Sequence, residues 1–155
     1  MAPVPGVSVR LAADADLEAL EALDPPGSGL SRARLTRQAA GGPLLLAAFD
    51  SSDCLGLCEL VRGDTTELRN LHVAPEARGR GVGTALIRAA EELVGTGRME
   101  LAVGLENPRA RALYLRLGYV STGRLRTDSY DYVDASGTTQ HAVETSEWLD
   151  KVLPG

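Results

Sequence analysis

The sequence predicts an α/β fold with a mixed, mostly antiparallel central sheet flanked by helices. Three observations support this prediction. Strand and helix patterns alternate along the 155 residues without a linker or a repeat, three consecutive strand patterns are joined by short turns, and the last two strand patterns form a hairpin. This length is typical of one domain and is sufficient for a substantial core, so residues 1–155 are expected to form a single domain.

The first half of the chain is expected to contain one strand, two helices and a three-stranded meander. Apolar residues recur on one face of the first helix, and a Pro-Pro-Gly segment ends it. A Gly-Gly pair ends the second helix, and short polar turns join the strands of the meander. The expected elements are strand 7–11, helix 14–23, helix 30–40 and strands 44–49, 55–62 and 66–73.

The second half is expected to contain two helices, a buried strand and a terminal hairpin. The first of these helices carries apolar residues on one face and stops at Gly95, which suits a helix end. A turn of sequence Asp-Ala-Ser-Gly separates the two strands of the hairpin. The expected elements are a helix from about residue 82, strand 99–103, a helix that begins at Asn107, and strands 119–133 and 143–152.

Residues 71–84 are the most informative segment, because an apolar strand pattern runs into a glycine-rich turn that opens a helix. Glycines at every second position let backbone N–H groups converge on an anion, and the helix adds the positive end of its dipole. Two arginines add positive charge. The residues expected to bind a phosphate group are Arg78, Gly79, Arg80, Gly81, Val82, Gly83 and Thr84.

The kind of phosphate ligand is narrowed by what this turn lacks. A nucleotide P-loop needs a lysine, and a dinucleotide fingerprint needs a glycine where Thr84 stands. The pyrophosphate of coenzyme A is the remaining common ligand of a strand, glycine-rich turn and helix. An ordinary surface loop is the alternative interpretation.

A second motif lies at residues 105–119 and predicts a short, well-capped helix. Asn107 suits the N-cap, Pro108 suits the first turn, and Gly118 suits the left-handed residue after the helix. Tyr114 lies on the face that is expected to be buried. It is interpreted either as a core residue or as a functional one, because a buried tyrosine hydroxyl needs a partner.

The glycine-rich turn and the pattern N-P-x-A-x-x-L-Y-x-x-x-G-Y, which begins at Asn107, together resemble the GNAT superfamily of acyl-CoA-dependent N-acyltransferases. The motifs cover residues 66–119, and the order of elements extends the resemblance to the whole chain. The resemblance implies a GNAT fold whose sheet splays between strands 66–73 and 99–103. It also implies that acetyl-CoA is the cosubstrate, and that a primary amine of a small molecule or peptide attacks it directly in a ternary complex.

The resemblance also assigns roles to individual residues. In this family the tyrosine at the position of Tyr114 points at the coenzyme sulfur, and the asparagine at the position of Asn107 contacts the pantetheine. A phenol can protonate a leaving thiolate, so Tyr114 is the expected acid. Glu67 is the candidate base, with an exposed strand glutamate as the alternative. The residues whose backbone N–H groups are expected to meet the oxyanion on a bulged strand are Leu71, His72 and Val73.

Composition excludes several other classes of partner. The net charge of −5 argues against nucleic acid or an anionic membrane as the main partner. The chain lacks a long apolar run and a signal-peptide pattern, so a cytoplasmic protein is expected.

Cys54 and Cys58 are expected on one face of a strand, too far apart for a disulfide. With two histidines beside them, no metal site is expected.

The identity of the acceptor is left open by the sequence. Asp128, Tyr130, Tyr132 and Asp134 alternate onto one strand face, which could hold a cationic amine or could simply be a solvated face. A homodimer is a possible assembly. The alternative function is a catalytically silent module that binds acyl-CoA and regulates, and a nucleotide-binding protein is the third interpretation.

Overall fold

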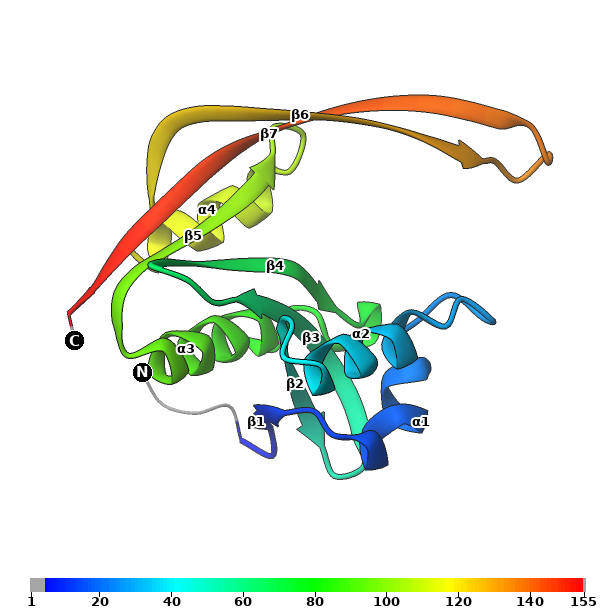
Figure 1. Cartoon of the computed structure of the whole chain (residues 1–155), viewed down its shortest axis with the longest axis horizontal. Helices are drawn as coiled ribbons and strands as arrows, with labels where there is room; N and C mark the ends of the chain where they lie inside the picture. Colours follow the sequence, from blue (N-terminus) through cyan, green and yellow to red (C-terminus); the bar gives the residue numbers. More distant parts are fainter. Residues whose placement is uncertain (1–4, 155) are drawn as a thin grey trace. The chain divides into compact units, whose positions relative to one another are not determined.

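The computed structural model describes residues 5–154, which divide into two compact units. The first unit runs to Met99 and also takes in the residues from Val152 onward, and the second unit is Glu100–Lys151. Figure 1 labels the α-helices and strands. The elements are β1 (Ser8–Leu11), η1 (Asp14–Asp16), α1 (Leu17–Glu21), α2 (Leu30–Ala39), β2 (Leu44–Asp50), β3 (Asp53–Val61), β4 (Thr65–Val73), η2 (Pro75–Ala77), α3 (Val82–Val94), β5 (Thr96–Gly104), α4 (Pro108–Arg116), β6 (Val120–Val133) and β7 (Thr139–Pro154).

Strands β1 to β4 of the first unit lie side by side in chain order, and each pairs antiparallel with the next. Short turns join β2 to β3 and β3 to β4, as expected for a meander. The predicted meander is therefore confirmed, with boundaries that differ by one or two residues. The first helix is shorter than predicted, because residues Asp14–Asp16 form a 3-10 turn ahead of the five-residue α1.

Helices cover both faces of this sheet. Leu57 of β3 packs in an apolar cluster with residues of α1 and α2, whereas a Cβ atom added at the adjacent Gly56 would lie 3.3 Å from Leu86 Cδ1 of α3. Neighbouring residues of a strand point to opposite faces, so α1 and α2 cover one face and α3 covers the other. The same Cβ atom would lie 2.8 Å from the carbonyl oxygen of His72. Only glycine allows this close approach of β4 and α3 to β3.

Both cysteines are buried in β3 as free thiols. The register Ala48↔Gly56 followed by Phe49↔Cys54 leaves Leu55 as an extra residue of β3, which reverses the direction of the side chains beyond it. The expectation that Cys54 and Cys58 share one face is therefore wrong. Burial raises the pKa of the Cys54 thiol to about 11 and that of the Cys58 thiol to about 12.

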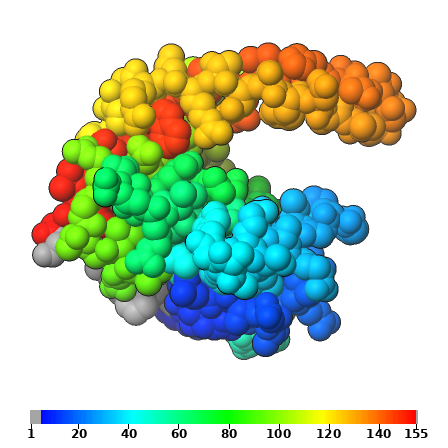
Figure 2. Space-filling model, viewed as in Figure 1, coloured from blue at the N-terminus to red at the C-terminus, as the bar shows by residue number. Residues whose placement is uncertain are grey.

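The second unit contains most of β5, helix α4 and the long β6–β7 hairpin, with β7 between β5 and β6. The hairpin is antiparallel from Val120↔Asp150 to Val133↔Thr139, and Figure 2 shows many of its side chains at the surface. Its buried side chains are few, and Leu149 is fully enclosed. The predicted α4 and terminal hairpin are confirmed, and β7 begins earlier than predicted.

The predicted fold class is confirmed: the chain has a mostly antiparallel sheet with flanking helices. The predicted splay between strands 66–73 and 99–103 stays a prediction, since β4 and most of β5 belong to different units. Among the described residues, no helix has the length and apolarity that a membrane crossing requires.

Candidate functional site

The turn between β4 and α3 is the structured form of the glycine-rich segment. β4 ends at Val73, a 3-10 turn follows at Pro75–Ala77, and α3 begins at Val82. Ala74 and Ala77 are buried and anchor the turn, whereas its arginines and Gly79 are exposed. The two buried alanines therefore pack the turn against the first unit, and the exposed residues of the turn are accessible to a ligand.

Two glycines of the turn adopt left-handed backbone conformations, with φ of 79° at Gly79 and 81° at Gly81. A Cβ atom added at Gly79 would meet nothing within 4 Å, so this position needs glycine for its backbone angle and not for space. Gly81 is the N-cap of α3. The alternating glycines thus reverse the chain direction just before the helix begins.

The N-terminus of α3 offers unpaired backbone donors. The bond from the Ala85 N–H to the Gly81 carbonyl, at 3.0 Å, is the first of the helix ladder, and no side chain caps the helix. The N–H groups of Val82, Gly83 and Thr84 therefore precede the ladder and lack intrahelical acceptors. Together with the positive end of the helix dipole, they form an anion-binding arrangement.

The two arginines of the turn are not equivalent. Arg80 lies 3.4 Å from Asp50 in an exposed ion pair, so part of its charge is already compensated. Arg78 has no ion pair among residues 5–154. Arg78 is therefore the more available counter-charge for an anion at this turn.

β4 carries a bulge ahead of the turn. Leu57 of β3 pairs with His72, but Glu59 pairs with Arg69, so Asn70 and Leu71 of β4 both oppose the single residue Cys58. Asn70 is left-handed, with φ of 57°. The extra residue bends the strand and reverses which of its later N–H groups face β3.

Glu67 and His72 differ in their surroundings. Glu67 is half-buried on β4 opposite Val61, and within the described chain it has no ion pair. His72 is exposed and lies opposite Leu57. The base hypothesis for Glu67 stays a prediction.

In the second unit Asn107 caps α4. Its side-chain oxygen accepts a hydrogen bond from the Ala110 N–H at 3.2 Å, and Pro108 occupies the first helical position. The predicted capping role is confirmed. A contact with pantetheine stays a prediction, and the amide nitrogen of Asn107 is the atom that capping leaves for it.

Tyr114 is held firmly on the inner side of α4. It is 7% exposed, and its ring meets that of Tyr119 edge to face, with centroids 6.5 Å apart. Gly118, at φ of 98°, lets the chain turn back so that the Tyr119 N–H donates to the Tyr114 carbonyl at 3.0 Å. This packing fixes the direction of the phenol, which is what an acid group requires.

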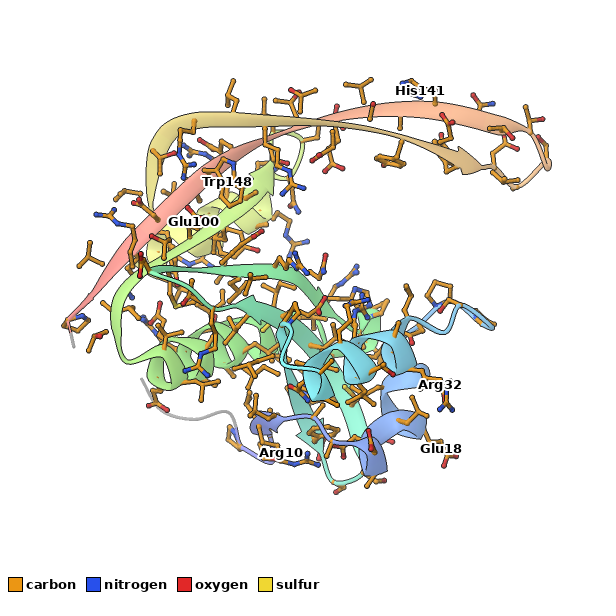
Figure 3. The ribbon with its side chains drawn as sticks, viewed as in Figure 1. Arg10, Glu18, Arg32, Glu100, His141 and Trp148 are labelled. Carbon is orange, nitrogen blue, oxygen red and sulfur yellow. The ribbon has the colours of Figure 1, made fainter. Side chains whose placement is uncertain are left out.

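Three aspartates at β6 and its turn already have polar partners. Asp128 pairs with Arg126 at 2.9 Å, and Asp131 pairs with His141, labelled in Figure 3, at 2.8 Å. Asp134 follows the end of β6, and its carboxylate closes the turn. Hydrogen bonds from Ser136, Gln140 and Thr138 lower the pKa of Asp134 to about 2. Asp134 thus lies in the turn and not on the strand face, and the suggestion that this face holds a cationic amine stays a prediction.

Two features of the structure are absent from the sequence predictions. The first is Trp148 of β7 (Figure 3), which lies below the guanidinium groups of Arg124 and Arg126, at 5.4 and 5.9 Å from the ring centroid. The second is Glu59, which is fully buried in β3. A lone glutamate within an apolar strand was the signal that could have identified it. Among residues 5–154, no group of three or more potential ligands could hold a metal ion.

The chain matches a protein-family model described as the acetyltransferase (GNAT) family over residues 13–119. It is 39% identical over 74 residues to an uncharacterised N-acetyltransferase of Methanocaldococcus jannaschii, which covers 46% of this chain and 33% of that protein. It is 37% identical over 109 residues to a mycothiol acetyltransferase of Mycobacteroides abscessus, which covers 62% of this chain and 36% of that protein. The chain thus spans about a third of the length of these curated relatives.

The fold is also similar to solved structures. The PaiA N-acetyltransferase of Thermoplasma acidophilum, in complex with coenzyme A, superposes with a TM-score of 0.66 at 18% identity. The match covers 94% of this chain and 98% of that one. At this identity the similarity shows that the two proteins share a fold.

Proposed function

The chain belongs to the acetyltransferase (GNAT) family, and on this basis we propose that it transfers an acetyl group from acetyl-CoA to a primary amine of a small molecule or peptide. The observation that carries the proposal is the β4–α3 turn, which presents three N–H groups without intrahelical acceptors beside an available arginine. The matched residues 13–119 run through both units, which supports a single acyltransferase domain.

Acetyl-CoA would be held mainly by the first unit. The pyrophosphate would accept hydrogen bonds from the turn, with Arg78 and Arg80 as counter-charges. The pantetheine and thioester would extend along the C-terminal half of β4. The residues proposed to bind the cosubstrate are Leu71, His72, Val73, Arg78, Gly79, Arg80, Gly81, Val82, Gly83, Thr84 and Asn107.

The proposed reaction is direct attack of the acceptor on the thioester. An amine of pKa about 10 is protonated at neutral pH, so Glu67 would first take one of its protons, directly or through water. The nitrogen lone pair then forms the N–C bond, and the carbonyl electrons move to the oxygen, which accepts a backbone N–H of β4. As the carbonyl forms again, the C–S bond breaks and its electron pair goes to sulfur. Tyr114 protonates this thiolate, because the thiol has a pKa of about 8.5, and the second proton that the amide nitrogen loses restores the phenol.

Ligand-dependent stability distinguishes this proposal from a nucleotide-binding protein. Acetyl-CoA at about 100 times its Kd should raise the melting temperature by roughly 5–10 °C, while ATP and NAD should leave it unchanged. Differential scanning fluorimetry measures all three ligands side by side. Equal stabilisation by ATP would contradict the assignment to coenzyme A.

The base hypothesis predicts a specific pH dependence for Glu67→Gln. The rate at neutral pH should fall by about 10- to 100-fold, and the deficit should shrink toward pH 10, where the acceptor amine deprotonates unaided. The measurement is the steady-state rate against pH, with an amine found by screening a panel and with chemistry limiting.

Glu92→Gln is the matched control for this prediction, because Glu92 is an exposed glutamate of α3 outside the proposed site. Its rate should follow that of the parent enzyme at every pH. If Glu67→Gln also follows the parent profile, Glu67 is structural and another residue or a water chain is the base.

The alternative of a silent acyl-CoA-binding module makes a different prediction. It requires normal binding of acetyl-CoA together with no acetylated product from any amine of the panel. Mass spectrometry of the products separates the two functions. The packed ring of Tyr114 agrees with both functions, so the product assay decides between them.

A further inference from the structure

A buried charged cluster connects α2, β3 and the bulge of β4, and the mechanism above does not use it. Its centre is Glu59, whose side chain is 1% exposed. Arg34 and Arg37 approach it from α2, and Asn70 approaches it from β4. All four residues belong to the first unit. Burial of a carboxylate lowers the stability of a protein unless several polar partners compensate it, so a buried glutamate is expected to have a specific role.

The hydrogen bond between Asn70 and Glu59 fastens the bulge to β3. The Asn70 Nδ2 atom donates to Glu59 Oε1 at 2.8 Å. Asn70 is the left-handed residue of the bulge, and asparagine is one of the few side-chain-bearing residues that adopt this conformation readily. The residue type therefore serves two purposes: the backbone accepts the positive φ, and the amide reaches the buried carboxylate.

Two arginines of α2 form ion pairs with the buried carboxylate. Arg34 Nε lies 3.6 Å from Glu59 Oε1, and Arg37 lies 3.6 Å from Oε2. Arg34 also pairs with Asp24 at 3.6 Å, and Asp24 accepts a hydrogen bond from the Ser31 N–H at the start of α2. The arginines therefore neutralise the carboxylate at ion-pair distance, whereas Asn70 donates a hydrogen bond to Oε1, and Oε2 accepts none from the residues that the structure describes.

The bulge decides where the Val73 N–H points. The Ala74 N–H donates to the Leu55 carbonyl of β3 at 2.8 Å. Successive N–H groups of an extended strand point to opposite edges, so the Val73 N–H points away from β3. Without the extra residue at the bulge, the alternation would be reversed and this N–H would face β3.

We propose that Glu59 is a positioning residue for acetyl transfer: through Asn70 it holds the β4 bulge that directs the Val73 N–H toward the acetyl carbonyl of the cosubstrate. This inference rests on the proposed function. It assigns Glu59 no contact with substrate. It predicts that loosening the bulge weakens recognition of the acetyl group and leaves recognition of the rest of coenzyme A unchanged.

The test compares the affinities of acetyl-CoA and CoA, which differ by the acetyl carbonyl, in Asn70→Gly. Glycine accepts the φ of 57°, and the substitution removes the side chain that donates a hydrogen bond to Glu59. We expect the Kd for acetyl-CoA to rise about tenfold, as for the loss of one hydrogen bond, while the Kd for CoA stays within about twofold. Isothermal titration calorimetry measures both constants in the same protein.

Ser51→Gly is the matched control. Ser51 is the other non-glycine residue with positive φ among the described residues, and it lies in the β2–β3 turn, outside the cluster. It controls for the backbone freedom that a glycine adds to the unfolded chain. Both affinities should be unchanged in this variant. A general loss of stability would affect the two ligands equally and would not change their ratio.

Glu59→Gln changes the acceptor of the same hydrogen bond and keeps the volume of the buried side chain. We expect a selective loss of acetyl-CoA affinity of about threefold, since a neutral oxygen accepts the Asn70 bond less strongly. The double variant should lose no more than Asn70→Gly alone, because Glu59 acts through Asn70. Additive losses would overturn the proposed route through Asn70.

The wild-type titration separates this inference from the proposed function. If the parent protein binds neither ligand, the proposed function fails and the inference with it. If the parent binds both ligands and Asn70→Gly leaves their affinity ratio unchanged, the inference alone is overturned. Hydrogen exchange of β2 and β3 in the variants confirms that they remain folded for the comparison.

Discussion

Gly81→Asp is expected to abolish binding of acetyl-CoA, with a loss of affinity of more than about 100-fold. The carboxylate would lie at the N-terminus of α3, beside the N–H groups proposed to bind the pyrophosphate. Two like charges about 4 Å apart repel by about 4 kcal/mol at the effective dielectric constant of a protein surface. Aspartate is a good N-cap, so the new side chain would also compete for the free N–H groups.

Gly95→Asp is the matched control for Gly81→Asp. Gly95 is the C-cap of the same helix and has the same φ of 81°, and an added Cβ atom there would meet nothing within 4 Å. The ψ angles differ, at 14° for Gly81 and −62° for Gly95, so aspartate is less strained at Gly81, and a loss of affinity there reflects the position of the charge and not backbone strain. Gly95→Asp should lower the melting temperature and keep the affinity for acetyl-CoA. Isothermal titration calorimetry measures the affinity of both variants for acetyl-CoA. An unchanged affinity in Gly81→Asp would refute the anion-binding role of the turn.

Tyr114→Phe is expected to lower kcat by about 100-fold or more while leaving the Kd for acetyl-CoA within about twofold. The substitution removes one hydroxyl and keeps the ring that packs edge to face against Tyr119. Without the phenol the thiolate must leave unprotonated or take its proton from water. The expected loss therefore lies in the chemical step, and rapid-quench measurements under single-turnover conditions report that step directly.

Tyr119→Phe is the control for Tyr114→Phe. It removes the hydroxyl from Tyr119, a residue that is 1% exposed and whose ring packs against that of Tyr114. Its kcat should stay within a few-fold of the parent value. A loss in Tyr114→Phe that is confined to KM would assign the tyrosine to binding. Equal losses of kcat in both variants would show that packing of the ring pair, and not the Tyr114 hydroxyl, is responsible.

The local signals of the sequence predicted the turn and the helix ends well. Gly81 and Asn107 stand where the structure has the N-caps of α3 and α4, and Gly118 has the positive φ expected after a helix. Each of these positions is determined by a few neighbouring residues and by backbone sterics. Such requirements are visible in one sequence because they do not depend on which strands pair.

The bulge of β3 could not be predicted in the same way, and the bulge of β4 was expected only from the resemblance to GNAT proteins. A strand pattern of period two gives no sign that one residue is extra, since the extra residue is defined by the partner strand. The extra residue Leu55 therefore made the predicted strand faces of Cys54 and Cys58 wrong. Asn70 was not identified as a residue of the β4 bulge. Likewise, Asp128, Asp131 and Asp134 looked available until the structure placed a basic side chain or a turn beside each of them.

The enclosed state of the two cysteines makes the protein unusually convenient for spectrophotometric work. A thiol-reactive chromophore consumes thiolate, and with pKa values of about 11 and 12 both side chains stay protonated and sheltered near pH 8. Colour that develops in a mixture of native enzyme, acetyl-CoA and amine should therefore come from liberated coenzyme A, with a negligible protein blank. Added denaturant should instead release two equivalents per chain, so the same reagent also measures the opening of β3.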